Sequence, residues 1–176
     1  MKKTIVLYPV SFIILMLIFS SMVKANHTSV EFQKLYFDVG YKGVHKALKE
    51  CNKHFKKDIA LPVQLPPIAF TYSFGRCNNL DGKANDGYEI EYLHRDKPIN
   101  HYMIRIQPNK YGLPIRKEHI DQTIKLKDGK TAIYTTKLVN GFNLLVFEKN
   151  DFQYVLSIDK RVSDKVTPEI LTEIAN

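Results

Sequence analysis

The residues best suited to chemistry in this chain are two histidines, His94 and His101, and one cysteine, Cys77. Glu89 and Glu91 lie close to His94, so a metal ion held by histidine and carboxylate is one interpretation. On a strand, however, alternate side chains point to opposite faces, and both glutamates would face away from His94. His101 could still approach across a strand pair. Because the sequence does not show that these ligands converge, no metal site and no cofactor is predicted.

The motifs of the common catalytic sites are missing from the sequence. The histidines lack the spacing of a zinc protease, and the serine-nucleophile, phosphate-loop and dinucleotide-binding motifs do not occur. Cys77 together with a distant histidine resembles a thiol nucleophile only in a generic way. The sequence therefore favours a non-catalytic protein with no catalytic residue, and an extracellular hydrolase built on His94, His101 or Cys77 is the less favoured alternative.

Cys51 and Cys77 are the only two cysteines. In an exported chain they can form a disulfide, which would close a loop of about 26 residues and add about 3 kcal/mol of stability. Alternatively, both are buried thiols that pack as small hydrophobic residues. The two alternatives stay open, because the sequence does not give the Cα separation that a disulfide needs.

A row of lysines is the candidate binding surface. Residues 44–55 have the pattern of an amphipathic helix, with Ala47 and Cys51 in its apolar stripe. The lysines assigned to the opposite side are Lys42, Lys46, Lys49, Lys53, Lys56 and Lys57. They could contact an anionic surface, although a solvated helix face has the same pattern.

The elements that would position these residues follow from the hydrophobic period. Residues 29–39 suit a helix, although the alternation of Val30 and Phe32 also allows a strand. Pro62, Pro66 and Pro67 enforce an extended connection after the lysine-rich helix. Residues 68–76 then alternate as a strand, with Phe70, Tyr72 and Phe74 on one face. Later strands are predicted over 88–94, 102–106, 123–127, 131–138, 142–147 and 152–158.

Short turns join these strands, and the turn at Asp128-Gly129 is a strong hairpin signal. Thr167 as a cap and Pro168 at the first helical position open a final helix. The sequence therefore predicts an α+β fold. Its mostly antiparallel sheet has about six strands, with an N-terminal amphipathic helix packed on one face and a short C-terminal helix.

The helix that ends in Phe55, then Leu61-Pro62 and Leu65-Pro66, then an aromatic strand, resembles an extracytoplasmic domain of unknown function from Gram-positive spore-forming bacteria. The resemblance covers roughly residues 44–176. It continues through Gly129-Lys130, Ala132-Ile133-Tyr134, Leu144-Leu145-Val146-Phe147-Glu148, Tyr154-Val155-Leu156 and Pro168-Glu169-Ile170-Leu171. The family usually has a Glu-Gly or similar turn after its Leu-Pro, where this chain has Pro66-Pro67-Ile68. The resemblance implies a location outside the membrane, for many members behind a single membrane helix and for some behind an anti-sigma-like anchor, and it carries over no catalytic residue.

The first 25 residues have the composition of an export signal. A basic start, Met1-Lys2-Lys3, precedes an apolar run over residues 4–23, and Ala25 has the small side chain expected before a cleavage site. Cleavage there would release residues 26–176 as a single extracytoplasmic domain. Since about 20 apolar residues also span a bilayer, the segment could instead stay as an N-terminal membrane anchor.

The positive net charge of the exported part indicates which kinds of partner it would attract. The whole chain has a net charge of +8, which includes three lysines and no acidic residue within positions 1–25. A basic exported domain would meet anionic cell-wall polymer, lipid head groups or a membrane protein, and no nucleic acid is expected. The favoured function is therefore an exported, non-catalytic cell-envelope domain that binds a partner or an anionic polymer. A membrane-tethered sensor or regulator is the alternative.

Overall fold

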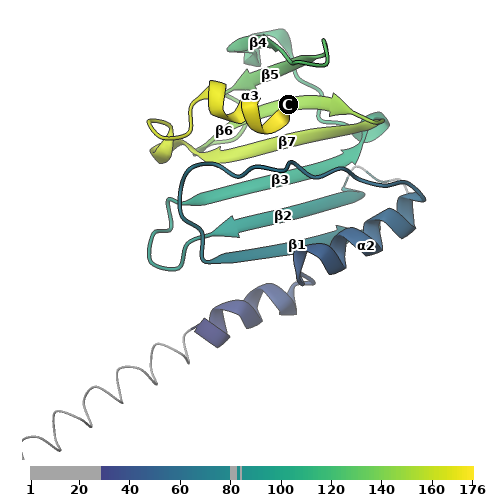
Figure 1. Ribbon diagram of the computed structural model, residues 1–176, viewed down its shortest axis with the longest axis vertical. Coiled ribbons are helices and arrows are strands. Elements are labelled where there is room, and N and C mark those ends of the chain that lie inside the picture. The colour runs from purple at the N-terminus through teal and green to yellow at the C-terminus, as the bar shows by residue number, and fades with distance from the viewer. Residues whose placement is uncertain (1–28, 80–82, 84) are drawn as a thin grey trace, which may run out of the picture. The chain divides into compact units, whose positions relative to one another are not determined.

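The computed structural model of the chain describes residues 29–79, 83 and 85–176 (Figure 1). The predicted signal or anchor, residues 1–25, lies outside the described residues. The chain divides into two compact units, Met1–Gly40 and Tyr41–Asn176. The described part of the first unit is a helix over residues 29–38 with a short turn after it. None of the described helices has both the length and the apolar character needed to cross a bilayer.

The second unit contains one antiparallel sheet of seven strands in the order β1-β2-β3-β7-β6-β5-β4. The strands are β1 Tyr72–Asn78, β2 Gly87–Leu93, β3 His101–Pro108, β4 Gln122–Lys125, β5 Thr131–Thr135, β6 Phe142–Lys149 and β7 Phe152–Asp159. The predicted α+β fold with a mostly antiparallel sheet is confirmed. Each of the seven strands overlaps one of the seven predicted segments, although the predicted total was about six.

The strand order shows two hairpin-connected groups, β1–β3 and β4–β7, that meet where β3 pairs with β7. That pairing runs from Tyr102 opposite Ile158 to Pro108 opposite Phe152. It places β4 at the edge farthest from β3, so the connection between them, residues 109–121, has to cross β7, β6 and β5. This connection contains the 3-10 turns η1 Asn109–Tyr111 and η2 Lys117–His119.

Two helices, α2 (Val44–Phe55) and α3 (Pro168–Ala175), contribute to the main core of the sheet (Figure 1). The short turn η3 Lys160–Val162 connects β7 toward α3. The strand residues most deeply buried in this core are Tyr88, Ile90, Tyr102, Ile104, Ile106, Leu145, Tyr154, Leu156 and Ile158. Helix α3 begins with Thr167 at the N-cap and Pro168 in the first turn, as predicted. The helices therefore cover one face of the sheet and remove its aromatic and aliphatic side chains from water.

Helix α2 packs closely on β1 because the residues at the contact are small. Ala47 and Cys51 are fully buried on the helix, and Gly75 on β1 lies opposite Ala47. A Cβ atom at Gly75 would lie 2.9 Å from the backbone Cα of Val44. The hydroxyl of Tyr88 donates a 2.7 Å hydrogen bond to the Val44 carbonyl, which satisfies a buried phenol at the same contact.

The segment before β1 differs from its prediction. The strand begins at Tyr72, and the Phe70 ring contacts Tyr92 and Tyr102 on the helix-covered face, with centroid distances of 5.7 and 6.4 Å. Tyr72 and Phe74 stack on each other and share the opposite face, because Gly75 points toward α2. The interpretation that Phe70, Tyr72 and Phe74 share one face was therefore wrong.

Proline explains why the strand starts late. Pro66 and Pro67 lack the amide donors of a continuous strand ladder, and the Asn100 side chain instead donates a 2.9 Å hydrogen bond to the Ala69 carbonyl. Backbone hydrogen bonding to β2 begins at Thr71, whose amide donates to the Leu93 carbonyl at 2.7 Å. The chain therefore changes direction between residues 69 and 71, and the alternation of Phe70 with Tyr72 is lost.

The contact at Gly75 gives a testable prediction. Gly75→Ala places a methyl group against the helix backbone, and we expect the free energy of unfolding to fall by about 1–3 kcal/mol. Gly43→Ser is the matched control, because a Cβ atom there meets nothing within 4 Å and serine is a favoured helix N-cap. Urea unfolding of both variants measures the difference, and equal stability would contradict the close approach of α2 to β1.

Candidate functional site

The face of the sheet opposite α2 and α3 carries a mixture of polar and apolar side chains. Because Tyr102, Ile104 and Ile106 enter the main core, strand alternation places the side chains between them on this second face, which we call the open face. A small apolar cluster lies there, formed by Leu144, Val146 and Val155 with Ile115, Leu138 and Phe142 packed against it. The open face is therefore partly apolar, although neither of the described α-helices of the second unit covers it.

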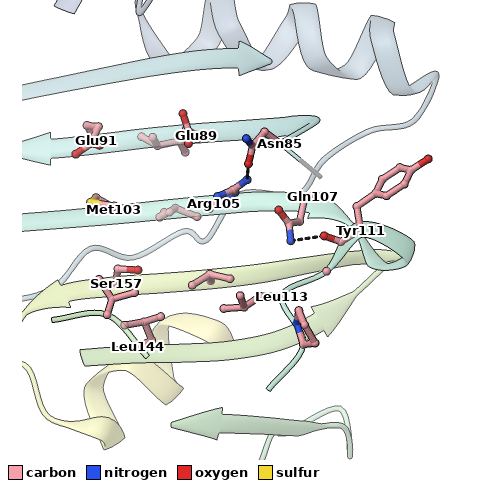
Figure 2. A pocket seen from close by; sticks show the side chains of 16 residues that line it. Asn85, Glu89, Glu91, Met103, Arg105, Gln107, Tyr111, Leu113, Leu144 and Ser157 are labelled. Atoms are coloured by element: carbon pink, nitrogen blue, oxygen red, sulfur yellow. Dashed lines mark hydrogen bonds between the residues drawn. The ribbon is translucent and has the colours of Figure 1, made fainter. Parts of the chain in front are cut away.

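A groove of about 430 Å³ opens on this face (Figure 2). Its floor comes from β3, β7 and β6, through Met103, Val155, Ser157 and Leu144. One wall is the segment Tyr111–Pro114 of the β3–β4 connection, which we call the strap, and Val139 borders the groove elsewhere. The lining is mostly apolar, with a few polar groups, and the volume is that of a small-molecule site.

The strap is held on the sheet by two buried glutamines. Gln153 on β7 accepts a 2.6 Å hydrogen bond from the Leu113 amide and donates a 3.1 Å hydrogen bond to the Leu113 carbonyl. Gln107 on β3 donates to the Tyr111 carbonyl at 2.8 Å (Figure 2). The Gln153 side-chain amide thus bonds both backbone groups of Leu113, as a neighbouring strand would, and these hydrogen bonds fix the position of the groove wall.

Glycine permits this close approach. A Cβ atom at Gly112 would lie 2.9 Å from the Gln153 side-chain nitrogen and 3.0 Å from the Asn109 carbonyl oxygen.

The far end of the same connection is attached to the sheet domain through Asp121. This carboxylate accepts hydrogen bonds from the amide and hydroxyl of Thr136 at 2.7 and 2.9 Å, and it forms an ion pair with Lys137 at 2.6 Å. The hydrogen bonds from Lys137 and Thr136 lower the pKa of Asp121 to about 2.

Charged residues gather at one end of the groove: Glu89 and Glu91 each contact a basic side chain, and Arg105 donates a 2.7 Å hydrogen bond to the Asn85 side chain. Glu89 accepts hydrogen bonds from Arg76 at 2.6 and 3.1 Å, and the Arg76 guanidinium lies 4.5 Å from the centroid of the Tyr41 ring. Glu91 lies 2.5 Å from the Nε2 atom of His101. Both carboxylates are therefore held by neighbouring side chains, and Arg76 places a positive charge beside Glu89.

The structure brings only some of the sequence-predicted residues together. Glu91 and His101 meet on neighbouring strands, whereas the Nδ1 atom of His94 accepts a hydrogen bond from the Asp96 amide in the following turn. Among the described residues, no group of three or more histidine, cysteine or acidic side chains is arranged to hold a metal ion.

Cys51 and Cys77 form a disulfide, with their Cα atoms 5.4 Å apart. Of the two alternatives left open by the sequence, the structure therefore has the bonded one. The bond joins the middle of α2 to β1. In this form the Cys77 sulfur is not a thiolate nucleophile.

The six lysines of the predicted surface do not form one group. Lys46, Lys49 and Lys53 are exposed on α2 and form no ion pair with another described residue. Lys42 precedes the helix, pairs with Gly75 through backbone hydrogen bonds and contacts Glu50 through its side chain at 2.6 Å. The remaining two follow the helix: Lys56 is its left-handed C-cap, and Lys57 forms an ion pair with Asp151.

The groove residues were missed by reasoning from the sequence. Gln107 and Gln153 are amide side chains within the predicted strand regions, but other polar residues such as Arg105 and Ser157 occur on the same strands, so the sequence carried only a weak signal. Their partners, Tyr111 and Leu113, lie on a connection that reaches the open face only because β3 pairs with β7.

No protein-family model, curated protein or solved structure matches this chain. The resemblance to the extracytoplasmic domain of unknown function therefore stays a prediction.

The attachment of the strap can be tested at Gln153. Gln153→Leu leaves the amide and carbonyl of Leu113 without their partner. We therefore expect the free energy of unfolding to fall by about 1–3 kcal/mol and hydrogen exchange at the Leu113 amide to become faster. Gln122→Leu is the control, because Gln122 is exposed on the edge strand β4. Unchanged exchange at Leu113 in the Gln153 variant would show that the strap is held by other contacts.

Proposed function

We propose that the protein is an exported, non-catalytic domain of the cell envelope that binds a small amphipathic ligand in the groove of the open face. Export is supported by the basic start and apolar run of the first 25 residues. The observation that carries the binding function is the groove itself, an apolar hollow of about 430 Å³ with positioned walls.

The rim of the groove supports an apolar ligand. Leu113 on the strap is 36% exposed and Val139 is 44% exposed, and both border the groove. Exposed apolar side chains at the mouth of an apolar hollow extend the surface that a ligand can remove from water.

The polar groups of the groove support an amphipathic ligand rather than a purely apolar one. The Ser157 hydroxyl makes no hydrogen bond with another described residue, although the surrounding floor is apolar. The carboxylate of Glu89 lies at the polar end of the groove. Its Oε2 atom accepts two hydrogen bonds from Arg76 and one from Asn78. A ligand with an apolar body and a hydrogen-bonding head matches this division.

The non-catalytic part of the proposal rests on the pairing of the reactive groups. Glu89 and Glu91 are each engaged by a basic neighbour, and Cys77 is bonded to Cys51. These contacts are those of a structural network and a cross-link.

Groove binding can be tested with the neutral apolar dye N-phenyl-1-naphthylamine, whose fluorescence rises in an apolar site. Leu113→Glu and Val139→Glu place a charge at the mouth of the groove, and we expect each to weaken dye binding at least about tenfold, because charge burial is costly. Val63→Glu is the control, since Val63 is 98% exposed and lies outside the groove lining. Equal dye affinity in all three variants would contradict a ligand site in the groove.

A second candidate function is adhesion to an anionic polymer through α2. The specific observation is that Lys46, Lys49 and Lys53 are exposed on one helix without an ion pair to another described residue, and that the disulfide holds this helix on the sheet. Three unpaired cations on successive turns attract a polyanion, and the attraction weakens as salt rises.

Charge reversal tests this candidate. Replacing Lys46, Lys49 and Lys53 by glutamate should abolish retention on an anionic wall polymer at low salt. The matched control replaces Lys125, Lys127 and Lys165 by glutamate. These lysines are also exposed, and their replacement gives the same change in net charge. Equal retention of the two triple variants would show that net charge, not the α2 surface, governs binding, and retention insensitive to salt would exclude the polymer.

A further inference from the structure

Ser157 places a buried hydroxyl on the floor of the groove. The residue is 7% exposed, and its hydroxyl makes no hydrogen bond with another described residue. Gln107, the other buried polar side chain of the lining, holds the strap through Tyr111. The Gln107 carbonyl oxygen has no partner among the described residues and is closed to solvent, whereas the Ser157 oxygen opens onto the groove. Because a buried hydroxyl is costly to leave unpaired, Ser157 marks a point at which a ligand gains a hydrogen bond.

Apolar surface surrounds this hydroxyl and extends from it along the strand. Met103 on β3 and Leu144 on β6 are the register partners of Ser157 and lie beside it in Figure 2. Along β7 the same face continues through Val155 to Gln153, which holds the strap about 13 Å from Ser157 at the usual rise per residue. This length of apolar floor suits an extended chain, which would lose its contact with water there.

The charged side chains of the lining lie away from this hydroxyl. Glu91, in the same row across the sheet, is two strands from Ser157, which is about 10 Å at the usual strand spacing. Arg105 donates its 2.7 Å hydrogen bond to Asn85, which precedes β2 and lies toward the opposite end of that strand from Glu91 (Figure 2). A charged ligand group at Ser157 would lose water without gaining a counter-ion, so the ligand group at this point is uncharged.

The single donor hydrogen of Ser157 indicates which uncharged group pairs with it. An ester carbonyl accepts that hydrogen and has no donor of its own, whereas a ligand amide or hydroxyl would bring a second hydrogen into the apolar floor. We propose that the ligand of the groove is a fatty-acyl ester whose carbonyl oxygen accepts a hydrogen bond from Ser157 and whose chain lies over Val155 toward the strap. The ester is a particular case of the amphipathic ligand proposed above, and it depends on that binding function.

Two lipids that differ in one carbonyl test this ligand class. Monolauroylglycerol carries the ester, and monododecylglycerol has an ether in its place with the same head and a matched chain. Each is used below its micelle-forming concentration to displace N-phenyl-1-naphthylamine from the native chain, from Ser157→Ala and from Ser73→Ala. Ser73 is the control position, because it is exposed on β1 and lies outside the groove lining. Unchanged dye affinity shows that each variant keeps its groove.

We expect the native chain to bind the ester about fivefold more tightly than the ether, which is the effect of one hydrogen bond. Ser157→Ala should lose this preference because it binds the ester more weakly, with its affinity for the ether unchanged, and Ser73→Ala should keep the preference.

Equal affinity of the native chain for the two lipids would overturn the ester, and so would a preference that survives in Ser157→Ala. Failure of both lipids to displace bound dye would also overturn the ester but would leave the groove as a binding site. Failure of the native chain to bind the dye at all would reject the groove function together with the ester.

Discussion

The pairing of β3 with β7 is the constraint on which the rest of the sheet domain depends. It unites two local groups of hairpins, and it places β4 at the opposite edge from β3. The chain must then cross the open face to reach β4, and the crossing segment becomes the wall of the groove. Gln107 and Gln153, which hold that segment, sit on these same two strands and are register partners. The groove is thus a consequence of strand order.

The two faces of the sheet meet different physical requirements. The helix-covered face is packed tightly enough that a single methyl group at Gly75 has no room, since α2 approaches β1 over Ala47 and Gly75. The open face is held by a few directional contacts at the strap and by paired charges beside it. Dense packing confers stability on the first face, and hydrogen bonds define the shape of the second.

Local signals predicted most of the fold and little of the site. The hairpin at Asp128-Gly129 forms as expected, with Gly129 at a positive φ of 82°, because a turn depends on neighbouring residues. The α2 helix and the helix opening at Pro168 follow from period and capping in the same way. The hydrogen bond between Gln153 and Leu113 joins residues 40 positions apart, and a hydrophobic period in the sequence cannot predict a contact at that separation. The face of Phe70 was misjudged because Pro66 and Pro67 delay the start of the strand, and the Ala69 carbonyl is bonded by the distant Asn100 side chain instead of a strand neighbour.

The disulfide also limits how far the chain can extend under mechanical load. Tension applied at the N-terminal side of the sheet domain would reach Lys42 and its backbone contact with Gly75 before α2. Beyond Cys51, the force would pass directly to Cys77 through the sulfur atoms, and the residues between them would carry none of it. The sequence separation of 26 removes roughly 90 Å of contour length from any stretched state. The disulfide therefore bypasses residues 52–76, which remain unstretched while the chain is pulled.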